Sequence, residues 1–170
     1  RVVVSLARSP CTMSALCPDS LTWMVVKDFN SFQRKRNGTT RRTGTVTLSA
    51  EPGNLTNTNS YKYSGFNSKT IGFTVQETEG PSGPRVSLEL ELKNAKKTQK
   101  PSQSKHKVPL RFKNYARAEK CIASQTIDSH YRKDLINAAM SRWAKLHSAR
   151  KVKEGTAKPM KKQPGRRSKA

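Results

Sequence analysis

The chain has 170 residues, of which 34 are Lys or Arg and 11 are Asp or Glu, and its formal net charge is +23. This length fits one domain with residues left over for tails, and a hydrophobic share of 33% is lower than that of chains that are globular throughout. So large an excess of positive charge repels itself in a compact chain. The composition therefore argues against an ordinary enzyme and favours an anionic partner, nucleic acid before an anionic membrane surface.

The first 18 residues are treated as an N-terminal extension. They contain no acid and several basic and hydroxyl residues, namely Arg1, Ser5, Arg8 and Ser9. That composition fits a transit peptide. The favoured alternative is that the protein starts at Met13 and that residues 1–12 are an upstream extension.

Residues 19–93 are predicted to form an α+β head. Apolar residues at spacings of three and four predict a helix from about Ser20 to Phe29, although residues 23–26 could also form a buried strand. Strands are expected over residues 32–36 and 43–49, on either side of a basic loop. In the second of these, Val46 and Leu48 share one face.

Two further strands are predicted in the second half of the head. Ile71, Phe73 and Val75 alternate with small or polar residues, and residues 86–92 show the same period of two. Between them, glycines and prolines predict a long hairpin loop over residues 77–84. We expect a small antiparallel sheet with a helix on its apolar face.

The C-terminal part of the chain carries most of the charge. Residues 94–170 hold 22 basic and 4 acidic residues. Residues 94–113 are predicted to be a basic extended linker, because residues 94–107 hold five lysines and no large apolar side chain.

Residues 114–150 are predicted to be a helical basic region. One helix is expected over residues 115–127, and a second begins near Asp134 and carries an apolar stripe. The stripe consists of Ile136, Ala139, Met140, Trp143 and Leu146. Residues 151–170 are predicted to be a basic tail that is disordered until an anionic partner orders it.

Residues that could carry catalysis or bind a metal are few. Cys11, Cys17 and Cys121 are odd in number and form no Cys-x-x-Cys pair, which argues against a zinc or redox motif and favours a reducing compartment. His106, His130 and His147 lie near no nucleophile motif. Asp128 and Asp134 are better explained by helix capping and local ion pairs. We expect no enzyme activity, no cofactor and no metal.

The aromatic residues have two possible roles. Tyr61, Tyr63, Tyr115 and Tyr131 lie beside or near Lys or Arg, so they could stack on unpaired RNA bases. Each could equally be a half-buried core residue, and both tryptophans are assigned to packing.

No apolar run approaches the roughly 18 residues of a membrane-spanning helix, and no motif supports sequence-specific DNA binding.

Two segments of the chain are distinctive, Trp-Met-Val-Val-Lys at residues 23–27 and Asn-Ser-Tyr-Lys-Tyr-Ser-Gly at residues 59–65. They resemble segments of the eukaryotic large-subunit ribosomal protein 28 family. Further matching segments, in the same order as in the family, are residues 31–32, 35–37, 51–55, 69–72, 114–118, 131–135 and 138–139. The chain departs from the family in residues 1–12, in an apparent insertion over residues 38–47 and in the central hairpin loop.

The resemblance implies a small α+β protein of the cytosolic large ribosomal subunit. It would bind large-subunit rRNA and neighbouring ribosomal proteins, pass through the nucleolus during assembly and have no catalysis of its own. The family is also similar to part of a nucleolar ribosome-assembly factor, so an assembly factor that binds pre-rRNA is the alternative.

The candidate RNA-binding residues are basic positions of the head, the linker and the helical region, chosen because Lys and Arg neutralise phosphates. They are Arg34, Lys35, Arg36, Arg41, Arg42, Lys62, Lys69, Lys105, Lys107, Arg111, Lys113, Arg117, Arg132, Lys133, Arg142, Arg150 and Lys151.

Overall fold

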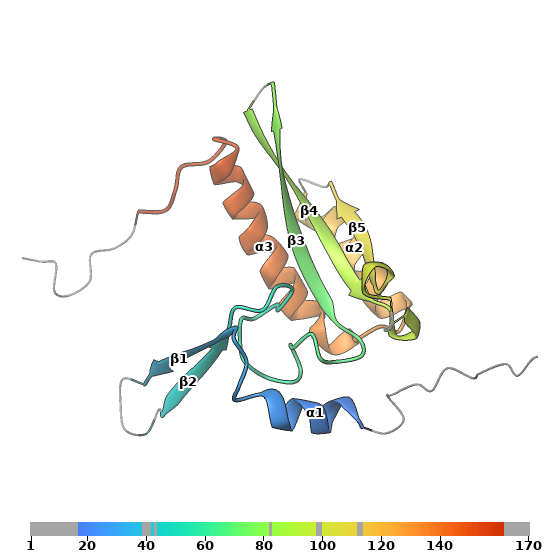
Figure 1. Ribbon diagram of the computed structural model, residues 1–170. Coiled ribbons are helices and arrows are strands. Elements are labelled where there is room, and N and C mark those ends of the chain that lie inside the picture. Colours follow the sequence, from blue (N-terminus) through green and yellow to red (C-terminus); the bar gives the residue numbers. More distant parts are fainter. Residues whose placement is uncertain are drawn as a thin grey trace, which may run out of the picture.

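The computed structural model describes residues 17–38, 42, 44–81, 83–97, 100–111 and 114–161. They form a three-stranded antiparallel sheet in the order β3–β4–β5, a separate β1–β2 hairpin and three α-helices (Figure 1). Helices α2 and α3 pack against the three-stranded sheet, while α1 and the hairpin lie near the end where β3 begins (Figure 1). The predicted α+β class with a small antiparallel sheet is confirmed. The helices that cover this sheet are α2 and α3 of the C-terminal region, rather than the helix of the head. Among the described residues, no helix is both long and apolar enough to cross a membrane.

The first helix, α1, spans Asp19–Val26. It confirms the predicted helix, which ends three residues earlier than expected, and the alternative of a strand over residues 23–26 is wrong. Trp23 is the buried residue of α1, and its ring lies 6.3 Å from that of Tyr61 and 6.0 Å from that of Phe66. These contacts fasten α1 to the loop that follows the β1–β2 hairpin.

The β1–β2 hairpin consists of β1, Gln33–Asn37, and β2, Thr45–Ser49, paired antiparallel. Both predicted strands are confirmed. Val46 and Leu48 share one face, as expected, but they are 39% and 37% exposed. A two-stranded ribbon has no second layer over this face, so the two side chains stay outside the main core.

Strand β3 spans Ile71–Gly80 and β4 spans Gly83–Lys93. The long loop predicted over residues 77–84 is wrong, because both strands continue to a tight turn at which Gly80 pairs with Gly83. Gly83 has φ +108°, which a glycine adopts at low cost in a short hairpin turn. The polar composition between the strands reflects an exposed ribbon rather than an irregular loop.

Strand β5, Lys105–Leu110, pairs antiparallel with β4. The prediction that these residues belong to an extended linker is wrong, because they form the third strand of the sheet. The connection from β4 contains two short 3-10 turns, Ala95–Lys97 and Pro101–Gln103. β4 supplies backbone partners to β5, and Leu110, 1% exposed, anchors it in the core.

Both predicted C-terminal helices are confirmed. Helix α2 spans Tyr115–Ala123, begins with the Asn114 side chain accepting a hydrogen bond from the Ala116 amide, and runs into a π-helical turn. Helix α3 spans Ile136–Lys153. It therefore includes the first residues of the predicted tail, while residues 162–170 lie outside the described residues.

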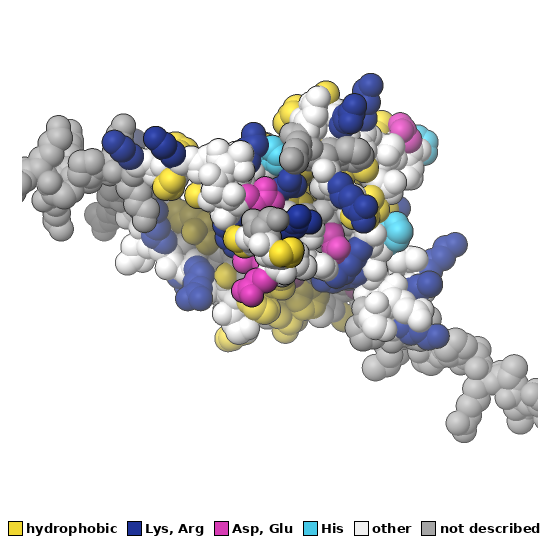
Figure 2. Space-filling model, turned by 90° about the horizontal axis from the view of Figure 1, so that it is seen from above, with side chains coloured by type: hydrophobic (Ala, Val, Ile, Leu, Met, Phe, Trp, Pro, Cys, Tyr) yellow, Lys and Arg dark blue, Asp and Glu magenta, His cyan; other side chains and the backbone are white. Residues whose placement is uncertain are grey.

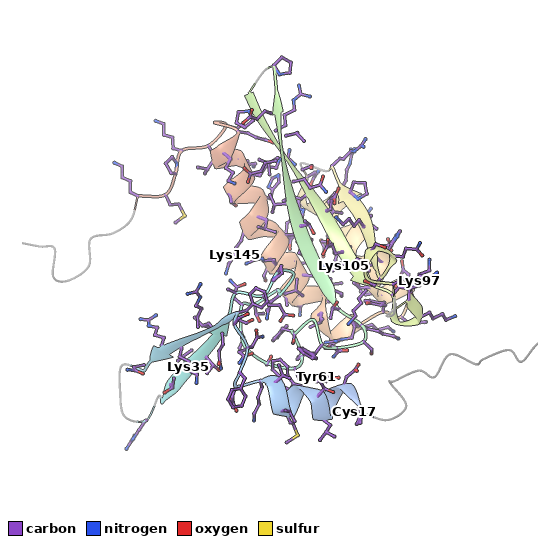
Figure 3. All side chains as sticks on the ribbon, viewed as in Figure 1. Cys17, Lys35, Tyr61, Lys97, Lys105 and Lys145 are labelled. Carbon is purple, nitrogen blue, oxygen red and sulfur yellow. The ribbon has the colours of Figure 1, made fainter. Side chains whose placement is uncertain are left out.

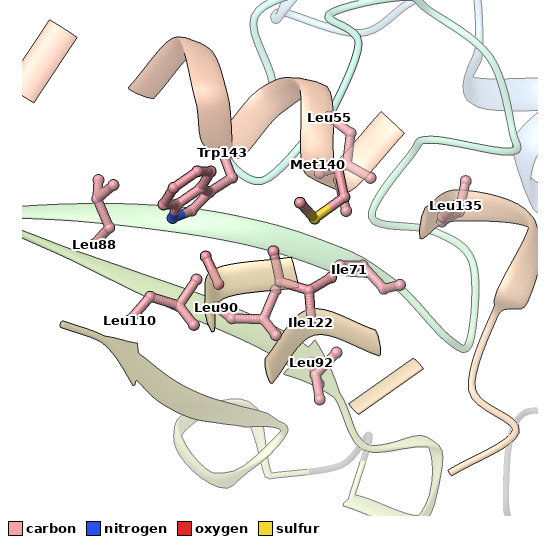
Figure 4. Close-up of a cluster of buried hydrophobic side chains, with 12 residues drawn as sticks. Leu55, Ile71, Leu88, Leu90, Leu92, Leu110, Ile122, Leu135, Met140 and Trp143 are labelled. Carbon is pink, nitrogen blue, oxygen red and sulfur yellow. The ribbon is translucent and has the colours of Figure 1, made fainter. Parts of the chain in front are cut away.

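The hydrophobic core lies between the sheet and the two C-terminal helices (Figure 4). Leu90 of β4 and Ile122 of α2 are fully buried, and Trp143 of α3 is 2% exposed. Ala139 and Met140 are buried beside Trp143, whereas Ile136 and Leu146 are partly buried. The predicted apolar stripe of α3 is thus the side that faces the sheet.

Gly72 of β3 marks a close approach of two backbone segments. A Cβ at this position would lie 2.9 Å from the Cα and the carbonyl oxygen of Gly53, which itself has φ +87°. Neither atom can move without shifting the loop, so we expect Gly72→Ala to lower the free energy of unfolding by about 1–3 kcal/mol. Urea denaturation followed by circular dichroism measures this change.

Gly80→Ala is the matched control in the same strand. Its Cβ would meet nothing closer than 3.5 Å, an ordinary contact, so this substitution should be close to neutral. Equal losses of stability for the two variants would contradict the argument from close approach.

Candidate nucleic-acid interface

The β1–β2 hairpin presents a row of unpaired cations. Arg34, Lys35 and Arg36 follow one another on β1 and are exposed, as is Arg42 in the turn. None of the four forms an ion pair with any described residue. Because side chains alternate along a strand, Arg34 and Arg36 share one face and Lys35 takes the other. Arg41, also predicted, lies outside the described residues.

Two adjoining concavities connect this hairpin with α3. One, of about 650 Å³, is lined by Arg34, Asn57 and Arg142, and the other, of about 360 Å³, by Asn57, Arg142 and Lys145. We call the two together the hairpin–α3 groove. It brings two predicted residues, Arg34 and Arg142, to one surface although 108 positions separate their numbers.

Carboxylates line the larger concavity as well. They belong to Glu51 and Glu91. Glu51 accepts a hydrogen bond from the Gly65 amide at 2.7 Å, and Glu91 is ion-paired with Lys105 at 3.2 Å. Both acids are therefore engaged by the chain itself, whereas the arginines of the groove carry no paired carboxylate within the described part.

Arg132 is committed to contacts within the fold. Its φ of +50° lies in the left-handed region, which costs a non-glycine residue about 1–2 kcal/mol. Its guanidinium donates to the carbonyl oxygens of Lys69 at 2.9 Å and Lys62 at 3.1 Å, and to both carboxylate oxygens of Asp134. Arg132 therefore ties the loop before β3 to the turn before α3, and we treat it as a positioning residue.

Lys62 and Lys69 are held near each other by this network. Lys62 lies 3.5 Å from Asp134 and 5.7 Å from the centre of the Tyr63 ring, and Lys69 lies 5.8 Å from the centre of the Tyr131 ring. The Tyr131 hydroxyl donates to the carbonyl oxygens of Thr70 and Lys93. Tyr131 is thus a half-buried structural residue. The sequence had left this role open beside stacking on an RNA base.

Lys105 and Lys107 of β5 face two acids of β4. Lys105 pairs with Glu91 at 3.2 Å, and Lys107 lies 3.8 Å from Glu89 and 3.7 Å from Glu91. Burial raises the pKa of Glu91, but hydrogen bonds from Thr74 and Lys105 and the two lysine charges outweigh it and hold that pKa below its ordinary value. These lysines are largely neutralised within the sheet.

The remaining predicted residues come from the helical region and its approach. Arg111, Arg117, Lys133 and Lys151 are exposed and have no ion pair with any described residue. Arg150 instead pairs with Glu154 at 3.1 Å, and its side chain is 10% exposed. Lys113 lies outside the described residues.

The β4–β5 connection carries cations that the sequence analysis did not select. Lys96, Lys97 and Lys100 are exposed and make no ion pair among the described residues. Lys97 lies on the opposite side of the molecule from Lys35 (Figure 3). The signal was present in the sequence as an acid-free lysine run, but only the fold separates these lysines from the paired ones in β5.

Basic side chains are not gathered into one compact patch. On the face seen from the end where the β3–β4 hairpin projects, Lys and Arg are scattered rather than gathered at one place (Figure 2). Such a distribution is suited to a partner that contacts several sides of the protein.

Buried aromatic and titratable groups of the helices serve packing. Trp143 lies with its ring centre 4.8 Å from that of His147 and 5.7 Å from that of Tyr115. Burial lowers the pKa of His147, and the charges of Lys151 and Arg150 add to the effect. The assignment of Trp23 and Trp143 to packing is confirmed. Among the described residues, no group of three or more His, Cys, Asp or Glu could hold a metal ion.

Acid is expected to weaken the fold through Asp134. Hydrogen bonds from Arg132 hold the pKa of Asp134 below its ordinary value, against the raising effect of burial, and the charges of Arg132 and Lys62 act in the same direction. The stabilisation is complete above the pKa of the unfolded chain and is lost as the pH falls through the lower pKa of the fold, below about pH 4. Urea denaturation between pH 7 and pH 3 should show this loss.

Asp134→Asn should be less stable at pH 7 and should lose less stability on acidification. Asp128→Asn is the control, because Asp128 is exposed and has no ion pair within the described chain. If both variants follow the same pH curve, the ion pair with Arg132 does not cause the acid sensitivity.

The sequence model of the Ribosomal L28e protein family matches residues 21–149. The chain belongs to this family. It is 32% identical over 143 residues to the "Large ribosomal subunit protein eL28" of Dictyostelium discoideum, and the aligned region covers 84% of this chain and 96% of that relative. The resemblance seen in the sequence is thereby confirmed.

The part of the chain that matches the L28e family includes the whole hairpin–α3 groove. Arg34 of β1, Arg142 and Lys145 of α3 and the unpaired lysines of the β4–β5 connection all lie within it. Arg150 and Lys151 lie just beyond it. The candidate interface therefore lies mainly within the residues that match the family, rather than in the N-terminal and C-terminal segments outside the match.

Proposed function

We propose that this L28e family member is a structural constituent of the large ribosomal subunit that binds large-subunit rRNA and has no catalytic activity of its own. The observation that carries the RNA-binding part is the hairpin–α3 groove, where Arg34, Arg142 and Lys145 meet and none of the three has an ion pair with a described residue. Phosphate oxygens are the ligands that such arginines and lysines bind best.

A second set of cations supports binding of RNA on several sides of the protein. Lys97, in the β4–β5 connection, lies on the other side of the molecule from Lys145 of the groove (Figure 3). A large folded RNA can surround a small protein in this way, whereas a single duplex would meet one face. We propose the remaining predicted cations as weaker contacts, with Arg132 and Arg150 acting through the fold.

We place the protein on cytoplasmic ribosomes, after passage through the nucleolus during assembly, with large-subunit rRNA and neighbouring ribosomal proteins as its partners. The alternative is a nucleolar assembly factor that binds pre-rRNA. Sucrose-gradient fractionation with mass spectrometry, repeated after a high-salt wash, separates the two. The proposal expects the chain in mature large subunits at the same abundance as other ribosomal proteins, whereas presence only on precursor particles would overturn it.

The salt dependence of RNA binding tests the electrostatic part on its own. If about ten phosphates are engaged, log K for purified large-subunit rRNA should fall with log salt at a slope of roughly −7 to −9. A slope shallower than about −3 would show that the basic residues do not drive binding.

A further inference from the structure

The outer side of α1 is an apolar surface that the fold leaves open. Leu21, Met24 and Val25 follow the helical spacing of three and four and are 52%, 65% and 67% exposed. Phe29 and Phe32, in the segment between α1 and β1, are 88% and 45% exposed. We call these five residues the α1 apolar patch.

The opposite side of α1 is already packed. Trp23 is 8% exposed and lies against Tyr61 and Phe66, and Asn59 donates a hydrogen bond to the carbonyl oxygen of Lys27 at 3.1 Å. A helix that is apolar on both sides is normally buried on both. Since the inner side is fixed to the chain itself, the patch faces away from the described fold, and an exposed apolar surface of this kind is typical of an interaction site.

The net charge beside the patch is negative, opposite in sign to the net charge of the whole chain. Asp19 and Asp28 lie at either end of α1, are exposed, and have no ion pair with any described residue. Lys27 is adjacent to Asp28 in sequence, so two acids and one cation leave a net charge of −1 beside the patch. In a chain of net charge +23, two free carboxylates flanking an apolar surface disfavour contact with phosphates here and favour a cationic partner.

A groove of about 610 Å³ adjoins this surface. Asp19, Phe32 and Phe66 line one part of it, and Lys93 and Lys105 line another. The two lysines are already engaged: Lys93 donates to the carbonyl oxygens of Gly65 and Asn67, and Lys105 pairs with Glu91. The groove can therefore accept an extended chain that carries apolar and basic side chains.

We propose that the α1 apolar patch and this groove bind a Lys/Arg-rich segment of another protein of the same particle. Apolar side chains of that segment would cover Met24, Val25 and Phe29, and its cations would lie beside Asp19 and Asp28. The inference rests on the proposed function, because it takes the large subunit as the place where the partner is met. An extended segment of this kind needs only a small surface with a few anchoring pockets.

Photo-crosslinking in the assembled particle tests this proposal. The residue p-benzoylphenylalanine replaces Met24 in one variant, Val25 in a second and Arg36 in a third, and large subunits are purified from cells that express each chain. Irradiation should link positions 24 and 25 to a peptide rich in Lys and Arg, identified by mass spectrometry. Position 36, on the hairpin, should be linked to rRNA.

Crosslinking of positions 24 and 25 to rRNA, to a segment without basic residues, or to nothing in purified subunits would overturn the inference. The proposed function would stand in each of these cases. Absence of the unmodified tagged chain from large subunits would instead overturn the proposed function, and the inference with it.

Charge reversal provides the second test. The double variant Asp19→Lys, Asp28→Lys should reduce the protein crosslink from position 24 at least fivefold and leave the rRNA crosslink from position 36 unchanged. Glu79→Lys, at the distant tip of the β3–β4 hairpin, is the matched control. Equal crosslinking from position 24 in the parent chain, in the double variant and in Glu79→Lys would show that the carboxylates of Asp19 and Asp28 do not recognise the partner.

Discussion

Replacing Trp143 with alanine is expected to lower the free energy of unfolding by about 3–5 kcal/mol. Trp143 is 2% exposed and is the largest fully buried side chain of the described core. Its ring lies between α3 and the sheet (Figure 4). The ring also packs against those of Tyr115 and His147. Removal of the ring leaves a cavity that none of these elements can close without moving, and urea denaturation followed by circular dichroism measures the loss.

Two controls separate the cavity from other effects. Trp143→Phe keeps an aromatic ring, and the indole nitrogen of Trp143 has no hydrogen-bond partner among the described residues, so this variant should lose far less stability than the alanine variant. Val152→Ala removes methyl groups from a position of α3 that is 38% exposed and should be within about 0.5 kcal/mol of the parent. A loss below about 1 kcal/mol for Trp143→Ala would contradict the described packing.

Neutralising the hairpin–α3 groove is expected to weaken binding to large-subunit rRNA by about 10²–10³-fold at 0.15 M salt. The variant carries glutamine in place of three unpaired groove cations, Arg34, Arg142 and Lys145, and in place of Arg36, which shares a face of β1 with Arg34. Each lost phosphate contact also removes nearly one unit from the slope of log K against log salt. The slope should therefore become shallower by about three to four, as measured by filter binding or fluorescence anisotropy over a range of salt concentrations.

The matched control carries glutamine at Lys107 and Lys153, which do not line the groove. Lys107 is already paired with Glu89 and Glu91, and Lys153 with Glu77, so both have little free charge to offer a phosphate. Their replacement should change the affinity less than tenfold. Equal effects of the two sets of substitutions would mean that total charge, rather than the groove, determines RNA binding.

The core elements that were predicted correctly, such as β4 and α3, are those whose side chains face one partner layer. In β4, Leu88 and Leu90 alternate with polar residues because one face covers the core, and in α3 the stripe through Trp143 does the same at helical spacing. A periodic pattern reports such one-sided burial directly. The pattern did not predict β5. This short segment contains a proline, and it becomes a strand only because the neighbouring strand β4 supplies its hydrogen bonds.

The turn between β3 and β4 was missed for a related reason. Glu77, Thr78 and Glu79 are polar and exposed, which is typical of a loop, but they pair across the ribbon with residues 84–86. The pairing is cooperative along the two strands and continues past the point where burial ends. Local composition contains no signal for that continuation.

The sequence by itself determined the α+β class, the family, the main periodic elements and an excess of positive charge so large that an anionic partner was expected. Only the tertiary structure decided which cations are free to meet that partner. Arg132 and Lys107 are as basic in the sequence as Arg34 and Lys97, yet the first two are occupied by carbonyl or carboxylate groups and the last two are open. Ion pairs and hydrogen bonds form only over about 3–4 Å. The sheet register and the loop contacts bring groups from distant parts of the chain within that distance.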